Sequence, residues 1–219
     1  MSNEQPLRRI GVIGDIHTES SRLEAALGFL QTAAVDRILA VGDIVTGSGD
    51  VNQCCALLRN FDVATVRGNH DRWFLTGMMW DLPEATSASD ISATTYDFLR
   101  SLPQTRTFET VAGHLLLCHG LGENDMGRLL PDDTGYALEA NEDLQRIIRS
   151  HEFAFVVHGH THQRMVRTFG DVTVINAGTL SRQHEPCFLL ADFGTGVVQF
   201  YDFHNNWDFV KGPAIQLSL

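Results

Sequence analysis

The sequence predicts an α/β fold, a four-layer α-β-β-α sandwich with two mixed β-sheets. Short apolar runs alternate with helix-like stretches between residues 9 and 66, and this β-α-β-α order is typical of a sheet covered by helices. From Thr107 onward short strand-like runs dominate, interrupted by one helix-like stretch. We therefore expect a second, largely antiparallel sheet that stacks on the first, with helices on the outside.

The first third of the chain contains three strand-like runs, and each ends in a polar turn that contains glycine. The predicted strands cover residues 9–14, 37–42 and 62–66, and the predicted helices cover residues 21–34, with Ser20 as N-cap, and 51–60. Active sites of α/β proteins lie beyond such strand ends, on loops that the sheet positions. The three turns are therefore where we expect the chemistry.

The later segments follow in order. Residues 72–106, which include Trp73, Met78, Met79 and Trp80, show no ligand-like pattern. They are interpreted as helices and loops flanking the site, either a small helical cap or a layer covering the sheet. Six further strands are predicted at 115–118, 153–157, 164–168, 172–175, 187–191 and 196–201, with a helix at 138–150. Because no linker or internal repeat divides the chain, residues 1–219 are expected to form one domain.

Charge and composition exclude several classes of function. The chain carries 27 acidic and 16 basic side chains, a formal net charge of -11, and no basic run, so strong nucleic-acid binding is not expected. Its 4 cysteines show no C-x-x-C spacing, which favours a reducing compartment. No signal-peptide core and no apolar run near the ~18 residues of a membrane span are present. The sequence therefore predicts a cytoplasmic protein without a membrane partner.

Two pairs of side chains have the spacing of metal ligands. Asp15 and His17 form a D-x-H pair after the first strand, and His160 and His162 repeat the spacing in HGHTH. Residues two apart in extended backbone point the same way, and Gly159 permits a tight turn beside an ion. A lone D-x-H pair is weak support, because an Asp at a strand end is often a helix cap. Two such pairs on different strands are harder to explain as core residues.

Three further side chains complete a candidate site for two ions. Asp43 follows the second strand, and a carboxylate is the natural group to bridge two cations. Asn69 offers an amide oxygen after the third strand, and His119 offers another imidazole after its own strand. This mixture of nitrogen and oxygen donors suits transition metals.

Taken together, the five motifs resemble those of the calcineurin-like metallophosphoesterase superfamily and occur in the same order. They are GDIH at 14–17, GD at 42–43, GNHD at 68–71, HG at 119–120 and GHTH at 159–162. The resemblance implies that Asp15, His17 and His162 hold one ion, that Asn69, His119 and His160 hold the other, and that Asp43 bridges them. It also places His70 beside the reacting phosphate as a catalytic residue. The adjacent Asp71 is expected to orient that imidazole, and it also suits the N-cap of a helix starting near Arg72.

The implied function is metal-dependent hydrolysis of phosphate esters, with phosphodiesters favoured, by attack of a hydroxide that bridges the metals. The implied cofactors are two divalent ions from the set Mn, Fe, Zn, Ni and Co, with manganese favoured. The segment GDIVTGSGD and the turn NAGT at 176–179 are most similar to the small bacterial phosphodiesterase-type branch. Thr18, Glu19 and Ala177 depart from that branch's pattern, which leaves the substrate open.

Two alternatives stay open. A protein serine/threonine phosphatase-like phosphomonoesterase usually shows GDxHG, GDxVDRG and GNHE, whereas this chain has Thr18, Thr46-Gly47-Ser48 and Asp71 at the differing positions. A metal-binding interaction scaffold without physiological catalysis is the other, and the complete ligand set with His70 argues against it. The expected partner is a phosphate ester substrate, and a homo-oligomer is not excluded.

The remaining histidines and three arginines match no ligand position. His114, His151, His158, His184 and His204 are interpreted as structural, with His184 the least secure because it follows the NAGT turn. Arg67, Arg72 and Arg128 are interpreted as solvated surface residues, with contact to substrate phosphate as the alternative.

Overall fold

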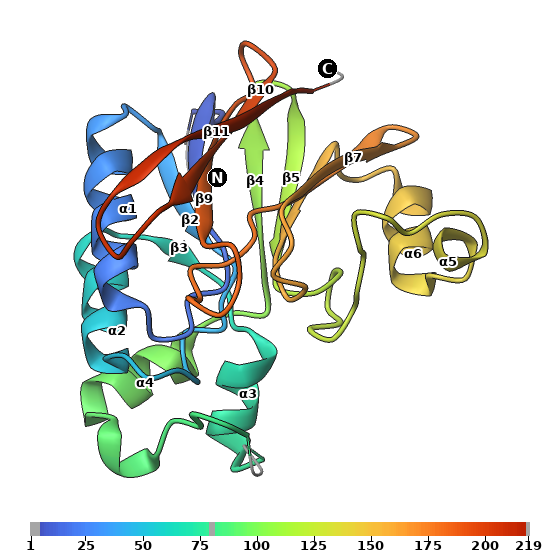
Figure 1. Cartoon of the computed structure of the whole chain (residues 1–219). Coiled ribbons are helices and arrows are strands. Elements are labelled where there is room, and N and C mark those ends of the chain that lie inside the picture. The colour runs from blue at the N-terminus through green and yellow to red at the C-terminus, as the bar shows by residue number, and fades with distance from the viewer. Residues whose placement is uncertain (1–4, 79–81, 218–219) are drawn as a thin grey trace.

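The computed structural model describes residues 5–78 and 82–217, which form two stacked β-sheets between outer layers of helices (Figure 1). The predicted α/β sandwich is thus confirmed. Met79 and Trp80, named above in the segment 72–106, lie outside the described residues. Among the described residues, none of the helices has the length and apolar character needed to cross a membrane.

The first sheet has the strand order β11-β10-β9-β1-β2-β3. Its members are β1 (Arg9–Ile13), β2 (Arg37–Ala40), β3 (Ala64–Thr65), β9 (Cys187–Asp192), β10 (Val197–Phe203) and β11 (Phe209–Gln216). Strands β1, β2 and β3 are parallel, while β9 pairs antiparallel with both β1 and β10, and β11 continues the antiparallel part.

The second sheet has the order β4-β5-β6-β8-β7. Its members are β4 (Thr105–Thr110), β5 (Gly113–Cys118), β6 (Phe155–His158), β7 (Met165–Phe169) and β8 (Val172–Asn176). The pairs β5-β6 and β6-β8 are parallel, and the two outer pairs are antiparallel. Both sheets are therefore mixed, as predicted.

The assignment of the last strands to the second sheet was wrong. Strands β9 and β10 join the first sheet instead, so the second sheet is half parallel rather than largely antiparallel. After β8 the chain crosses to the first sheet through a turn in which Leu180 N–H donates to Asp15 O at 2.8 Å. Strand β9 of the first sheet and strand β8 of the second are both buried along nearly their whole length, so an apolar run alone does not reveal which sheet a strand joins.

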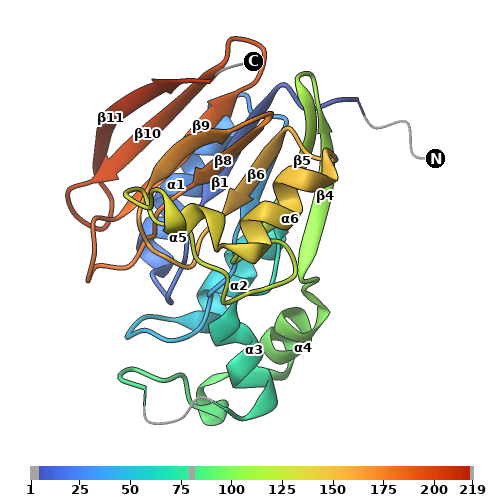
Figure 2. The same cartoon turned by 90° about the vertical axis from the view of Figure 1, so that its right-hand side faces the viewer.

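Helices cover the outer face of each sheet. α1 (Ser20–Thr32) and α2 (Val51–Asn60) lie on the first sheet, and α5 (Tyr136–Glu139) and α6 (Glu142–Ser150) lie on the second (Figures 1 and 2). Ser20 is the first residue of α1, and its N-cap is Glu19, so the predicted cap is corrected by one residue. The single helix predicted at 138–150 is interrupted because Asn141 caps α6 by accepting from Leu144 N–H.

The segment 72–106 contains most of α3 (Asn69–Thr76), the 3₁₀ helix η1 (Ala88–Asp90) and α4 (Ala93–Ser101). In Figure 1, α3 and α4 lie below the sheets. Leu99 of α4 and the adjacent Leu102 pack in the same apolar cluster as Leu58 of α2. The segment thus packs against α2, and its two interpretations, a small helical cap and a layer covering the sheet, stay predictions.

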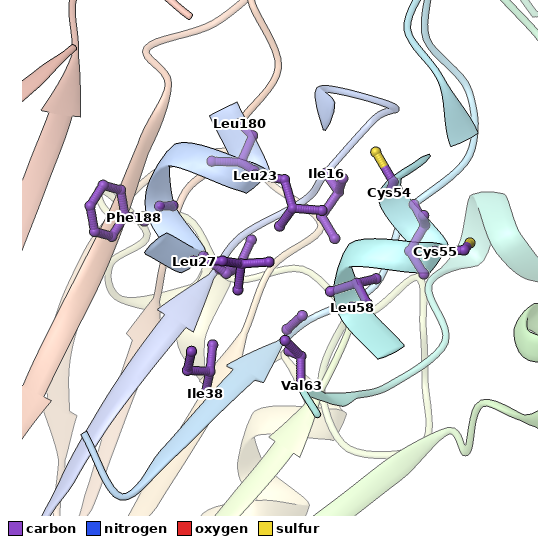
Figure 3. Packing of buried hydrophobic residues seen from close by; sticks show 14 of the residues in the cluster. Ile16, Leu23, Leu27, Ile38, Cys54, Cys55, Leu58, Val63, Leu180 and Phe188 are labelled. Carbon is purple, nitrogen blue, oxygen red and sulfur yellow. The ribbon is translucent and has the colours of Figure 1, made fainter. Parts of the chain in front are cut away.

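Three apolar clusters separate the four layers. The first lies between the outer helices and the first sheet and includes Leu27 and Phe188 (Figure 3). The second lies between the sheets, and the third lies between the second sheet and α6. Along β5, Leu115 and Leu117 face the first sheet while Leu116 faces α6, which is the alternation of a strand buried on both faces. This rigid framework holds the ends of β1, β2, β5 and β6 at one edge.

Candidate metal centre

Four predicted ligands converge at that edge from three strand ends. Asp15 and His17 follow β1, Asp43 follows β2, and His162 follows β6. Their ligand atoms all lie within 4.8 Å of one another, and the Nε2 atoms of His17 and His162 are 3.0 Å apart. The two carboxylates are buried, so water does not compensate their charges.

The other predicted ligands lie beside this group. Asn69 Oδ1 is 2.8 Å from His119 Nε2 and 2.9 Å from His160 Nδ1. Asp43 Oδ2 is 3.4 Å from His119 Nε2 and 3.9 Å from His17 Nε2. One oxygen of Asp43 therefore lies between the two groups, and the structure brings all seven predicted residues together.

The backbone that positions these side chains is not the extended backbone that the spacing argument assumed. His17, Asp43, His160 and His162 all have positive φ, at 44°, 47°, 67° and 60°. Non-glycine residues adopt this left-handed region at a cost, and such residues concentrate at functional sites. The expectation of a tight approach at Gly159 holds, because a Cβ there would lie 2.7 Å from Asp15 Oδ2.

The hydrogen bonds of two histidines fix which ring nitrogen is free. His17 Nδ1 is 2.9 Å from Thr46 O, and His119 Nδ1 is 2.8 Å from Val41 O. A carbonyl only accepts, so each Nδ1 carries a proton, and in the neutral ring Nε2 keeps its lone pair. When both rings are neutral, Nε2 of His17 lies beside Nε2 of His162, and Nε2 of His119 lies beside the oxygens of Asn69 and Asp43. A cation between these atoms turns repulsion into coordination, so the donor set fits two metal ions.

The pKa shifts of the clustered side chains also favour a bound cation. Burial raises the pKa of Asp15 to about 6. Burial alone would lower the pKa of His119, but the carboxylates of Asp43 and Asp15 outweigh it and raise that pKa to about 10. Burial lowers the pKa of His160 to about 4 and that of His162 to about 3, helped by the charges of His119 and His17 respectively. His119 thus carries a proton that balances the buried carboxylates, while His160 and His162 stay neutral, and a bound metal cation would take over that balancing charge.

The NAGT turn supports the ligand loops, a role that the sequence did not reveal. Asn176 is buried, and its Nδ2 donates to Gly159 O at 2.8 Å and to Thr161 Oγ1 at 3.1 Å, while its Oδ1 accepts from Gly178 N–H at 2.8 Å. Thr179 Oγ1 donates to Asp15 O at 2.8 Å. An asparagine at a strand end next to a histidine-rich loop was the available signal.

Replacing Asn176 with alanine is expected to leave Gly159 O and Gly178 N–H without these partners. The free energy of unfolding should fall by about 1–3 kcal/mol, and metal affinity should fall about 10- to 100-fold, as for other residues that support ligands. Thermal unfolding and metal titration measure the two effects. Asn205→Ala, in an exposed turn, is the matched control, and unchanged metal affinity in Asn176→Ala would show that the loop holds its shape alone.

The expected orienting role of Asp71 needs correction. Its Oδ1 accepts from Ile44 N–H at 2.9 Å and Val45 N–H at 3.2 Å, and its Oδ2 accepts from Gly68 N–H at 3.0 Å. None of these bonds reaches His70. Asp71 is also not the N-cap, because α3 begins at Asn69 and Asp71 is its third residue. The carboxylate therefore ties the second and third motif loops together.

His70 lies at the edge of the cluster. Its side chain is 20% exposed, and its Nε2 is 3.9 Å from Asp43 Oδ2. Its backbone N–H donates to Asp43 Oδ1 at 2.8 Å, which leaves Oδ2 of Asp43 toward the other ligands. The ring packs against Trp73, with centroids 4.9 Å apart, and burial lowers its pKa.

A cavity of about 210 Å³ opens beside the cluster. It is lined by His17, Glu19, Thr46, Gly47, Ser48, His70, Leu82, Pro83, Glu84, His162, Ser181, Arg182, Gln183 and His184. His184 also packs against His162, with ring centroids 4.5 Å apart, and its interpretation as structural stays a prediction. Arg72, by contrast, forms a two-bond ion pair with Asp125 and is not a free phosphate-binding group.

Comparison with known proteins places this site in a family. The calcineurin-like phosphoesterase superfamily domain matches residues 9–196, which is most of the chain. The protein therefore belongs to the calcineurin-like phosphoesterase superfamily, as the motifs predicted.

Individual relatives resemble the chain in sequence or in fold. The chain is 37% identical over 62 residues to the uncharacterised protein MJ0912 of Methanocaldococcus jannaschii, a match that covers 28% of this chain and 26% of that protein. The hypothetical protein PH1004 of Pyrococcus horikoshii superposes with a TM-score of 0.74 at 17% identity, over 89% of this chain and 87% of that one. A metallophosphoesterase of Sphaerobacter thermophilus gives 0.67 at 21% identity, over 90% and 88%.

Proposed function

We propose that this protein is a dinuclear metal-dependent hydrolase of phosphate esters, with phosphodiesters as the favoured substrates. The observation that carries the proposal is the convergence of seven nitrogen and oxygen donors, several of which lie within 3.0 Å of one another. Asp15, His17 and His162 would hold one divalent ion, and Asn69, His119 and His160 would hold the other, with Asp43 shared. Manganese is favoured among Mn, Fe, Zn, Ni and Co.

Two bound ions would supply a nucleophilic water with a lowered pKa and positive charge for the phosphoryl oxygens. The protein's own part is to fix the donors. Asp43 is held through Oδ1 by the backbone of His70, so its Oδ2 is the atom we assign to bridging. His70 lies beside the cavity and is the group we assign to the leaving oxygen, as proton donor.

The charges around the cavity favour a diester over a doubly charged monoester. Arg182 is the one arginine or lysine among the described residues that line it, and Glu19 occupies one edge of that side chain, so no cluster of cations is left for the second negative charge of a monoester at the metal centre. We expect kcat/KM for bis-p-nitrophenyl phosphate to exceed that for p-nitrophenyl phosphate, with the protein loaded with manganese. A clear preference for the monoester would favour the phosphatase-like alternative instead.

The molecule's organisation supports two further proposals. Residues from Ile10 to Leu217 share the cluster between the sheets, which supports one domain over the chain, with 72–106 as the segment flanking the site. All four cysteines are free and buried, which supports a reducing compartment such as the cytoplasm.

A further inference from the structure

One arginine at the cavity is held in an unusually fixed position. Glu19, whose side chain is 6% exposed, accepts from Arg182 Nε at 2.7 Å and from Arg182 Nη2 at 3.0 Å, and its Oε1 also accepts from Arg182 N–H at 2.9 Å. Arg22 Nη1 lies 2.9 Å from the other oxygen of Glu19. Glu19 is therefore paired with two arginines, and these three side chains together keep one net positive charge.

The N–H groups of Arg182 that have no partner in the described part of the chain lie on one edge of its guanidinium group. A guanidinium group has two edges that can each bind an oxyanion through two parallel hydrogen bonds. Glu19 occupies the Nε/Nη2 edge of Arg182, and among the described residues no hydrogen bond or ion pair reaches Nη1. The Nη1/Nη2 edge is thus free on a side chain that is 51% exposed and lines the cavity with His70 and His162.

Neighbouring groups do not satisfy that edge. Glu84 lines the same cavity, but its carboxylate accepts from Gln183 Nε2 at 3.3 Å and forms no ion pair with Arg182 among the described residues. Arg182 is thus fixed in place and open, which lowers the entropy lost when it binds a ligand.

We propose that Arg182 binds a second phosphate group of the substrate through its Nη1/Nη2 edge. The substrate class is then a phosphodiester whose alcohol part carries a further phosphate. This inference rests on the proposed function, because the scissile phosphate is taken to lie at the metal centre, and it deepens that function by assigning the specificity to Arg182 with Glu19 as its positioning residue.

Two matched esters test the proposal: the p-nitrophenyl ester of thymidine 5′-phosphate, and the same ester with a 3′-phosphate. Both are diesters that release p-nitrophenol. We expect the wild-type protein to show a lower KM for the 3′-phosphorylated ester, by about 10-fold or more for a two-bond charged contact. Arg182→Gln should remove most of that preference by raising KM, with kcat nearly unchanged for both esters. Arg182→Lys should restore only part of it, because lysine lacks the second edge.

The matched control is Arg146→Gln on α6, where Arg146 pairs with Asp143 at 3.0 Å and is 69% exposed. It changes the net charge equally and should keep the preference. The proposal is overturned if Arg182→Gln weakens both esters alike, if the wild type has no preference, or if Arg146→Gln loses it equally.

Calorimetry separates this inference from the proposed function. If no ester is hydrolysed, the proposed function fails. The affinities of adenosine 3′,5′-bisphosphate and adenosine 5′-monophosphate then still test whether Arg182 binds a second phosphate group. Tighter binding of the bisphosphate by wild type, lost in Arg182→Gln, supports the subsite. Equal affinities for the two nucleotides in the wild type overturn it.

Discussion

Asp43→Asn is expected to remove both ions from the centre and nearly all turnover. Asp43 Oδ2 is the atom between the two ligand groups, 3.4 Å from His119 Nε2 and 3.9 Å from His17 Nε2. An asparagine has no negative charge there, and its amide nitrogen would bring hydrogens toward the cations in one of its two orientations. Loss of a supporting residue already costs 10- to 100-fold in metal affinity, so losing a shared ligand should cost about 100-fold or more.

Metal content of the purified variant and kcat on bis-p-nitrophenyl phosphate measure this effect on the same preparation. Asp143→Asn is the control, because Asp143 is 19% exposed, pairs with Arg146 and lies outside the cluster. Two tightly held ions with near-normal turnover in Asp43→Asn would exclude Asp43 as the shared ligand.

His70→Ala should separate chemistry from metal binding. The imidazole is assigned no ligand role, and the contact that holds Asp43 comes from the backbone N–H of residue 70, which alanine retains. The variant should therefore keep two ions. If the imidazole protonates the leaving oxygen, kcat should fall about 10²- to 10⁴-fold for an alkyl leaving group and less for p-nitrophenolate.

The measurement is kcat for both ester types, together with metal content, in His70→Ala and in His114→Ala, a remote exposed histidine. Equal losses for both leaving groups would assign His70 to stabilising charge on the phosphoryl oxygens instead. Loss of metal would make His70 a ligand and contradict the division of roles.

The candidate ligands were predictable from the sequence because their residue types are rare together and follow strand ends. Asp15, His17, Asp43, His160 and the others meet where the motifs placed them. The backbone conformation differs from the extended one that the spacing suggests, since His17, Asp43, His160 and His162 all have positive φ. Local spacing indicates which residues are candidates, but it does not fix the backbone conformation that brings them together.

What the sequence could not predict depends on contacts between distant segments. Strands β9 and β10 join the first sheet through pairing with β1, and their apolar pattern suits either sheet. The position of Asp71 next to His70 predicted that it orients this imidazole. Its carboxylate instead accepts a hydrogen bond from Ile44 N–H, 27 residues earlier in the chain. The pairing of Glu19 with Arg182, 163 residues later, is also invisible to any local pattern.

We propose that seven side chains hold two divalent ions at the carboxyl ends of β1, β2, β5 and β6. Crystals of the manganese-loaded protein, measured at the manganese absorption edge, test it directly through the anomalous signal. Two strong anomalous peaks are expected to flank Asp43 Oδ2, one beside His17 and His162 and one beside Asn69 and His119. A single peak, or peaks away from these side chains, would exclude this arrangement of two ions.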